Sequence, residues 1–502
     1  MLRTTLVLLA ATASVLAESQ IEALRQDASK RRVIDDAIKT LRDYYNYAAI
    51  ADEKGDSRSA DKRDEALAKF LAWAEKSIET IGVNILADTD SLVDLFDQGR
   101  VSSLSRTKIR PTTLDYLTVD GRGGSRGLEY SVRVPRGYKT DNKLPLVLTL
   151  HSRVINQNHP AFRGSAQRFL ERGRAPITDY WLESPALEEL LLLAPTGQAT
   201  GFEFGARHFE DVITLMHGIG AALENYRVDW NRMFLEVQGT AMRVACEYPS
   251  LFAGFIVRDG EVPPEHFCSF ENLNGVPLIY IADEKRWSTV GQKLCEALAA
   301  AYEAAGAKDR LVVIRAQRDA NEALKGDMER VAKFVRETQR GAAPKALSWR
   351  FFRESMLHAL PCEIGLANYA YLPGEPLEKS AGRLTMKVTR EEDAEKKPFS
   401  KIDVQITEAE SLSLFLDDRL VPLDEPVSLV VNGVTVHDRV QLKRDPHMFV
   451  GNLARRFFML PYMAEMRAHF ALKPELAPPP PPPAPPAPAV EDGGENEPEK
   501  PE

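Results

Sequence analysis

The first hundred residues place apolar side chains at alternating steps of three and four, which gathers them on one face of an α-helix. Two runs follow this spacing, and they comprise Ile34, Ile38, Leu41, Tyr45 and Ala48, and then Leu67, Phe70, Ala74, Ile78 and Ile81. The polar stretch 52–61, which contains Gly55, separates the two runs. We therefore predict a helical hairpin, followed by a short third helix over 85–96.

Short apolar runs begin near residue 129 and alternate with amphipathic ones. This pattern is typical of a mostly parallel sheet covered by helices on both faces. Strands are predicted at 129–134, 146–150, 190–194, 233–237, 254–257, 278–281 and 311–314, and helices at 209–226, 242–248, 290–305 and 327–340. The expected fold class of this region is α/β.

From residue 347 the pattern changes to apolar and polar residues in alternation, which is typical of antiparallel strands. The predicted strands are 384–388, 402–406, 412–416, 427–431 and 435–440. Asn432-Gly433 lies between the last two, and this dipeptide favours a tight hairpin turn. The stretch 453–470, interrupted by Pro461, is predicted to contain closing helical segments.

These patterns divide the chain into five parts. They are a signal peptide (1–17), a helical region (18–112), an α/β domain (113–340), an antiparallel β domain with closing helices (341–470) and a proline-rich acidic tail (471–502). The tail cannot bury apolar surface, so we expect it to be extended or disordered. Its proline run is typical of ligands for proline-recognition domains and of plain spacers. We favour a spacer, because composition is the only feature that would support a ligand.

The N-terminus has the pattern of a secretory signal. Arg3 precedes an apolar stretch at 6–13, and Val15 and Ala17 stand where a signal peptidase reads small or aliphatic residues. The segment is too short to span a bilayer, and no later apolar run is long enough to do so. We expect a secreted protein, periplasmic or extracellular, that is cut before Glu18.

Composition adds little beyond this organisation. The 502 residues carry 64 Lys plus Arg against 73 Asp plus Glu, a formal net charge of -9. The tail contributes -5 of that charge, so the rest of the chain is only mildly acidic. Because nucleic-acid binding needs a basic surface, the balance argues against a nucleic-acid partner.

The chain has four cysteines, Cys246, Cys268, Cys295 and Cys362. In an exported protein they can form two disulfides, in any of three pairings, and we expect them to be structural bridges or buried thiols. Their spacings fit no metal site, and the histidines do not cluster with cysteines or carboxylates at metal-ligand spacing. We therefore expect no metal and no cofactor.

Three segments of the α/β region contain motifs in a fixed order. They are Leu144-Pro-Leu-Val-Leu-Thr-Leu-His151-Ser152; Val228-Asp-Trp-Asn-Arg232 through Gly239-Thr-Ala-Met-Arg243 to Tyr248-Pro-Ser-Leu-Phe-Ala-Gly254; and Pro277-Leu-Ile-Tyr-Ile-Ala-Asp-Glu-Lys-Arg-Trp287. Together, over about residues 128–340, they resemble the α/β-hydrolase superfamily, in particular secreted esterases and the polyhydroxybutyrate-depolymerase-like and prolyl-oligopeptidase-like enzymes. The resemblance implies an oxyanion loop after the first segment, a G-x-S-x-G nucleophile turn in the second and a catalytic acid at the end of the third.

The resemblance puts the nucleophile at Ala241, which has no nucleophilic atom. Gly239 is kept, but the closing glycine of the turn is replaced by Arg243. Thr240 precedes the nucleophile position, and we expect its hydroxyl to be satisfied within the turn. The nucleophile motif is therefore degenerate.

The acid and base positions have diverged as well. The resemblance puts the acid at Lys285, and Asp283 or Glu284 can replace it only if the loop shifts. The base should lie around 318–321, yet no histidine occurs from residue 267 to residue 357. Because a serine nucleophile needs a base that is oriented by an acid, we expect no hydrolysis by this route.

The oxyanion loop is altered too. Ser152, Arg153 and Val154 replace the glycines that usually let backbone amides face the developing charge. Ser152 adjoins His151, but the equivalent histidine of the family supports the loop, so a Ser152–His151 nucleophile pair is the weaker alternative. His208, at a helix start, is expected to cap the helix or face solvent, and His358 is expected to be a packed histidine of the β domain.

Four cations, Arg153, Arg243, Lys285 and Arg318, follow strands whose ends converge in this fold. If they meet, the vestigial pocket can bind an anionic ligand or an acidic partner. The favoured alternative is that they pair with Asp283, Glu284 and Asp319, or fill the space that glycines left.

The sequence therefore predicts a secreted, non-catalytic α/β-hydrolase-like protein with a binding or structural role toward a protein, envelope or polymer partner. The first alternative is an active serine esterase or peptidase of the same superfamily that uses a displaced nucleophile. The second is a fold retained only as a scaffold for the β domain.

Overall fold

The structure is a computed structural model, and the part of it that is described begins at residue 20 and ends at residue 469. The described ranges are 20–103, 115–119, 128–135, 138–139, 142–150, 189–195, 219–220, 222–223, 225–237, 242–258, 262, 269–284, 287–316, 321–340, 345–351, 358–359, 362–365, 382–409, 411–455 and 463–469. The predicted signal peptide, the proline-rich tail and most of the predicted helix 209–226 lie outside them.

The N-terminal region is the predicted helical hairpin. It comprises α2 (Gln20–Leu24), α3 (Ala28–Lys54), α4 (Ser57–Glu75), α5 (Ser77–Ile81), a 3₁₀ turn η1 (Ile85–Ala87) and α6 (Thr89–Ser103). Gly55 ends α3 with a φ of 61°, and the side chain of Asp56 accepts the Arg58 amide to begin α4. A left-handed glycine followed by an Asp N-cap is what a sharp reversal between two helices requires.

The α/β region contains one eight-stranded sheet. Its strands are β1 (Asp115–Val119), β2 (Leu128–Arg133), β3 (Leu144–Leu150), β4 (Leu191–Pro195), β5 (Val228–Val237), β6 (Gly254–Arg258), β7 (Leu278–Asp283) and β8 (Leu311–Ala316). Their order is β1-β2-β4-β3-β5-β6-β7-β8, in which β2 is antiparallel to β1 and β4 and the other pairs are parallel. The predicted α/β class is confirmed, with β1 as an additional strand.

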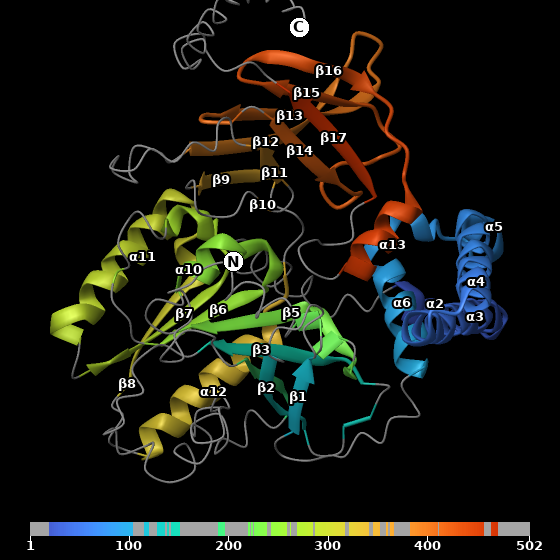
Figure 1. Cartoon of the computed structure of the whole chain (residues 1–502). Helices are drawn as coiled ribbons and strands as arrows, with labels where there is room; N and C mark the ends of the chain where they lie inside the picture. The colour runs from blue at the N-terminus through green and yellow to red at the C-terminus, as the bar shows by residue number, and fades with distance from the viewer. Residues whose placement is uncertain are drawn as a thin grey trace, which may run out of the picture.

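Helices cover both faces of this sheet (Figure 1). One face packs with α10 (Met242–Glu247) and α11 (Gln292–Ala304), and the other packs with α12 (Asn321–Glu337). On the α12 face, a Cβ added to Gly254 would lie 2.7 Å from the ring of Phe334. A glycine at the start of β6 therefore lets α12 approach the sheet closely.

The C-terminal region contains two smaller sheets, ordered β16-β15-β13-β12-β9 and β10-β11-β14-β17. The strands are β9 (Ala346–Phe351), β10 (His358–Ala359), β11 (Cys362–Gly365), β12 (Gly382–Glu392), β13 (Pro398–Ile406), β14 (Ser411–Leu416), β15 (Val427–Val431), β16 (Val434–Val440) and β17 (Ala464–His469). The hairpin predicted at Asn432-Gly433 is confirmed, and both residues have positive φ, 51° and 81°. Such a turn matches the twist of the two strands that it joins.

Two expectations for this region are wrong. The stretch 453–470 is not helical throughout, because the helix α13 (Pro446–Arg455) ends early and 464–469 forms β17. Ala464, Met466 and Ala468 are buried while Arg467 is exposed, a period of two that suits a strand. The domain is also not purely antiparallel, since β13 and β15 pair in parallel.

The helical region and the β domain share one hydrophobic core. Buried residues of α3, α4 and α6 belong to the same cluster as those of β9, β12, β13 and β15. The rings of Phe96 on α6 and Phe449 on α13 lie 5.6 Å apart. The two regions meet at these helices, which lie next to each other in Figure 1. We call residues 20–103 and 345–469 the helix–β unit, and residues 115–340 the sheet unit. In the described part of the chain no helix is long and apolar enough to cross a membrane.

Candidate functional site

The carboxyl ends of the parallel strands form the end of the sheet where the sequence resemblance places catalytic groups. β5 ends at Val237 and α10 begins at Met242, so the nucleophile turn is the connection Gln238-Gly239-Thr240-Ala241. β8 ends at Ala316 and α12 begins at Asn321, so the base would come from Gln317-Arg318-Asp319-Ala320. Strand and helix bounds therefore confine both groups to short connections.

Most of the predicted site residues lie outside the described residues, in these connections. His151, Ser152 and Arg153 directly follow β3, and Lys285 follows Glu284 after β7. Ala241, Thr240, Arg318 and His208 are also outside them, and of Arg243, Asp283 and His358 only the backbone is described. Glu284 is described and exposed. The structure therefore neither gathers nor separates the four cations predicted at this end.

A buried polar cluster lies at the carboxyl ends of β3, β5 and β6, on the α12 face of the sheet. The Thr149 hydroxyl donates to a carboxylate oxygen of Glu236 at 2.5 Å, and the Arg258 guanidinium pairs with the other oxygen. The three residues come from β3, β5 and β6, and all are less than a tenth exposed. Glu236 is thus held by partners, so we see no free carboxylate in it for acid–base chemistry.

A second polar cluster at this end is accessible to solvent. The guanidinium of Arg315, near the end of β8, lies 3.9 Å from the ring centre of Trp287. A carboxylate oxygen of Glu284 lies 3.6 Å from a nitrogen of the same guanidinium. The side chains of Arg315 and Glu284 are 51% and 42% exposed. Trp287 begins a π-helical turn (Trp287–Gly291) that leads into α11. Short π-helical segments are frequent at functional sites.

The cysteines differ in their bonding. Cys246, on α10, is disulfide-bonded, whereas Cys295, on α11, is free. Because Cys295 is free, the four cysteines do not form two disulfides, and a structural bridge coexists with a free thiol. Partial burial raises the pKa of the Cys295 thiol and Glu296 adds to this effect, while Arg315 opposes it.

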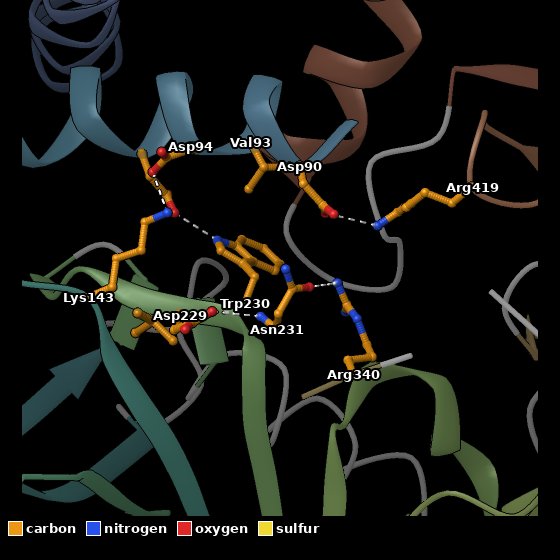
Figure 2. A pocket seen from close by; sticks show the side chains of 11 residues that line it. Asp90, Val93, Asp94, Lys143, Asp229, Trp230, Asn231, Arg340 and Arg419 are labelled. Carbon is orange, nitrogen blue, oxygen red and sulfur yellow. Dashed lines mark hydrogen bonds and ion pairs between the residues drawn. The ribbon is translucent and has the colours of Figure 1, made fainter. Parts of the chain in front are cut away.

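The opposite end of the sheet carries an extensive polar network that the sequence did not predict. Asp94 on α6 accepts Lys143 at 2.7 Å and Arg227 at 3.3 Å, which stand just before β3 and β5. Asp97, one turn further along α6, accepts the Trp230 indole N–H at 2.9 Å and Arg100 at 2.7 Å. Figure 2 shows Trp230 directed at α6 from the start of β5. This network joins the helix–β unit to the sheet unit.

Burial dominates the electrostatics of Asp97. Desolvation raises the pKa of this carboxyl, although Arg100 opposes the shift. The small cavity beside it has a volume of about 30 Å³ and is also lined by Asp90, Asn231 and Arg419 (Figure 2). That volume suits about two water molecules and no organic substrate. We therefore assign this end of the sheet to assembly of the fold.

Asparagine side chains extend the same junction. Asn272, in the 3₁₀ turn η7 (Phe270–Leu273) before β7, accepts the backbone N–H of Arg350 at 2.7 Å and donates to its carbonyl at 2.8 Å. Asn274 accepts the Ser348 N–H at 2.9 Å. These amides pair with the free edge of β9 as a neighbouring strand would, so the edge is covered.

Within the described residues, no cluster of histidine, cysteine, aspartate or glutamate side chains is arranged to hold a metal ion.

Comparison with known proteins gives matches only among solved structures. No protein-family model matches the chain, and no curated protein matches it. Solved structures similar to it include a thermostable esterase (17% identity, TM-score 0.33, covering 45% of this chain and 64% of that one). They also include Porphyromonas gingivalis dipeptidyl peptidase 4 (14%, 0.32, 46% and 36%) and a putative dienelactone hydrolase from Klebsiella pneumoniae (12%, 0.31, 45% and 99%). The chain therefore spans less than two thirds of the esterase and about a third of the peptidase.

These TM-scores are low, and the decisive observation is the order of the strands. The order β1-β2-β4-β3-β5-β6-β7-β8, with β2 reversed, forms one mostly parallel sheet, and the three motifs of the sequence resemblance fall on β3, on β5 to β6 and on β7. The sheet unit thus has the predicted α/β-hydrolase-like architecture, a mostly parallel sheet with helices on both faces. Fold alone does not establish activity, which depends on the residues that follow β3, β5, β7 and β8.

Proposed function

We propose that this protein is a secreted, non-catalytic member of the α/β-hydrolase fold that acts by binding or as a structural component. One observation carries the proposal: the connection between β5 and α10 reads Gln-Gly-Thr-Ala, and the connection after β8 contains no histidine. The first offers only a threonine hydroxyl, and the second offers no imidazole base. Because these connections are bounded by described elements, this inference does not depend on a fine alignment.

Export is supported by two independent features. The N-terminal segment has the composition of a signal peptide, and Cys246 is disulfide-bonded. Disulfides form and persist in oxidising compartments outside the cytosol. We propose a periplasmic or extracellular location, with a protein, envelope component or polymer as the partner.

The position of the helix–β unit favours binding over substrate gating. Its described polar contacts with the sheet unit involve Lys143, Arg227, Trp230 and η7, which lie at or just before the starts of parallel strands. In α/β sheets, ligands bind outside the carboxyl ends of the strands. The contacts therefore fall at the end of the sheet opposite the one where a ligand would enter.

Purified mature protein treated with a fluorophosphonate probe, and assayed on short-chain nitrophenyl esters, tests the loss of chemistry. We expect no active-site labelling and no turnover above a heat-denatured control. Labelling that disappears in Ser152→Ala or Thr240→Val would instead establish the alternative of a displaced nucleophile.

Restoring the serine alone gives a second test. Ala241→Ser should stay inactive, because no histidine is available after β8 to act as base. Turnover in this variant would mean that another side chain supplies the base and that the protein is a hydrolase one substitution from activity.

A further inference from the structure

We propose that Arg315, held on the face of Trp287 and loosely paired with Glu284, is a binding site for a carboxylate-bearing ligand. The inference deepens the proposed binding function and rests on it. All three side chains lie at the carboxyl ends of β7 and β8, the end of an α/β sheet at which ligands bind. They come from neighbouring strands and the helix between them, because Ala282 of β7 is paired in register with Arg315 of β8.

Stacking prepares the guanidinium for recognition. At 3.9 Å from the ring centre of Trp287, the Arg315 guanidinium is attracted by the π-face and restricted in orientation. A planar guanidinium with one face covered still presents its N–H groups at its edges, and that geometry matches a carboxylate through two parallel hydrogen bonds. Half of the Arg315 side chain is exposed, so a ligand can reach those edges.

Glu284 shows that the site accepts a carboxylate and that this carboxylate can be displaced. Its oxygen lies 3.6 Å from the Arg315 guanidinium, which is longer than a hydrogen bond, and its side chain is 42% exposed. Exposed ion pairs of this kind contribute little to stability. A ligand carboxylate in direct hydrogen-bonding contact would therefore replace Glu284 at small cost, and Glu284 acts as an internal competitor.

The helix that starts here adds a favourable potential. Trp287 begins the π-helical turn that continues into α11, so the N-terminal end of this helix lies beside Arg315. Backbone N–H groups at a helix N-terminus favour a negative charge. The end of this helix beside Arg315 thus favours an anion.

Citrate titration followed by NMR of the tryptophan side chains tests the site in the mature protein. The chain has five tryptophans, and Trp287→Phe identifies the Trp287 indole signal. We expect citrate, at constant ionic strength, to shift this signal with saturation in the millimolar range. Arg315→Gln should weaken binding about tenfold or more, because it removes a charge-assisted contact. Glu284→Gln should tighten binding severalfold, because it removes the competing carboxylate.

Arg310→Gln is the matched control, since it removes the same charge from the other end of β8 and should leave citrate binding within twofold of wild type. A citrate shift that does not saturate, or that survives in Arg315→Gln, would overturn the site. Equal affinity for sulfate would overturn its assignment to carboxylates. This test is independent of the test for the non-catalytic function. Ester hydrolysis would refute the non-catalytic function and leave the Arg315-dependent citrate shift standing, whereas absence of that shift would refute the binding site alone.

Discussion

Buried charges that pair within the chain lie at both ends of the parallel sheet, since Glu236 and Arg258 form such a pair near the carboxyl ends, but the carboxyl ends also carry an exposed pair. At the amino ends of the strands, Asp94 and Asp97 are almost fully buried and are surrounded by cations and an indole donor that belong to the protein itself. At the carboxyl ends, Glu284 and Arg315 are about half exposed and only loosely paired. Buried charges are retained only when their own chain compensates them, whereas exposed ones remain available to outside groups.

This difference separates assembly from recognition. The helix–β unit contacts the sheet unit at the amino ends of the strands. The charged residues of this contact, Asp94 and Asp97 with their partners, are therefore remote from the carboxyl ends, where a hydrolase has its active site. Substitutions in the connections at the carboxyl ends therefore need not affect the joint between the units.

The largest effect should come from the shared core of the helix–β unit. Phe449→Ala removes a fully buried ring that packs against Phe96 of α6, and it should cost about 3–5 kcal/mol. Because one core contains both regions, hydrogen exchange should accelerate in α3 and α6 as well as in β12 and β13. Hydrogen exchange with mass spectrometry measures this directly.

Phe255→Ala is the matched variant in the sheet unit, where the ring is also fully buried. It should accelerate exchange in β5, β6 and β7 and leave α3 protected. If Phe449→Ala affected only the β strands, the helical region would have a core of its own and the helix–β unit would not be one body.

An intermediate effect is expected at the joint between the units. Asp94→Ala leaves Lys143 and the buried Arg227 without the carboxylate that they share, and it should destabilise the protein by about 2–3 kcal/mol. Asp90, one turn earlier on α6, lies 3.6 Å from Arg419 and is about half exposed. Asp90→Ala should therefore cost under about 0.5 kcal/mol. Denaturant unfolding of the two variants compares them, and equal losses would refute the view that buried compensation holds the joint.

Much of the fold was predictable from the sequence, because local patterns determine local structure. The helical hairpin followed from apolar spacing and Gly55, and the strands of the large sheet followed from short apolar runs. Asn432-Gly433 predicted its hairpin because few other residues adopt its left-handed conformations. β17 was missed because six residues containing Ala464, Met466 and Ala468 satisfy a helical reading as well as a strand reading.

The joint and the shared core were not predictable in this way, since both depend on partners far apart in the chain. Nothing local to Asp94 announces Lys143 or Arg227, and Trp230 was only part of a family-like motif. One part of the candidate site was predictable from the sequence, because Ala241 and Lys285 differ from a known motif. The stacking of Arg315 on Trp287 was not predictable, because no sequence motif indicates it.

The smallest effect should appear at the carboxyl ends, in the titration of Cys295. Burial disfavours the thiolate, so the pKa of Cys295 lies above that of an ordinary thiol, and Arg315 partly offsets the shift. Arg315→Gln should raise this pKa further, and Glu296→Gln should lower it, because Glu296 adds to the shift. The pH midpoint of alkylation by iodoacetamide, followed by mass spectrometry at Cys295, reports the thiolate fraction independently of access. Since Arg315 is exposed and weakly paired, its replacement should change the free energy of unfolding by under about 0.5 kcal/mol. An unchanged midpoint would refute the influence of Arg315 on the Cys295 thiolate. A loss of stability as large as that of Asp94→Ala would place Arg315 among the structural charges and remove the contrast between the two ends of the sheet.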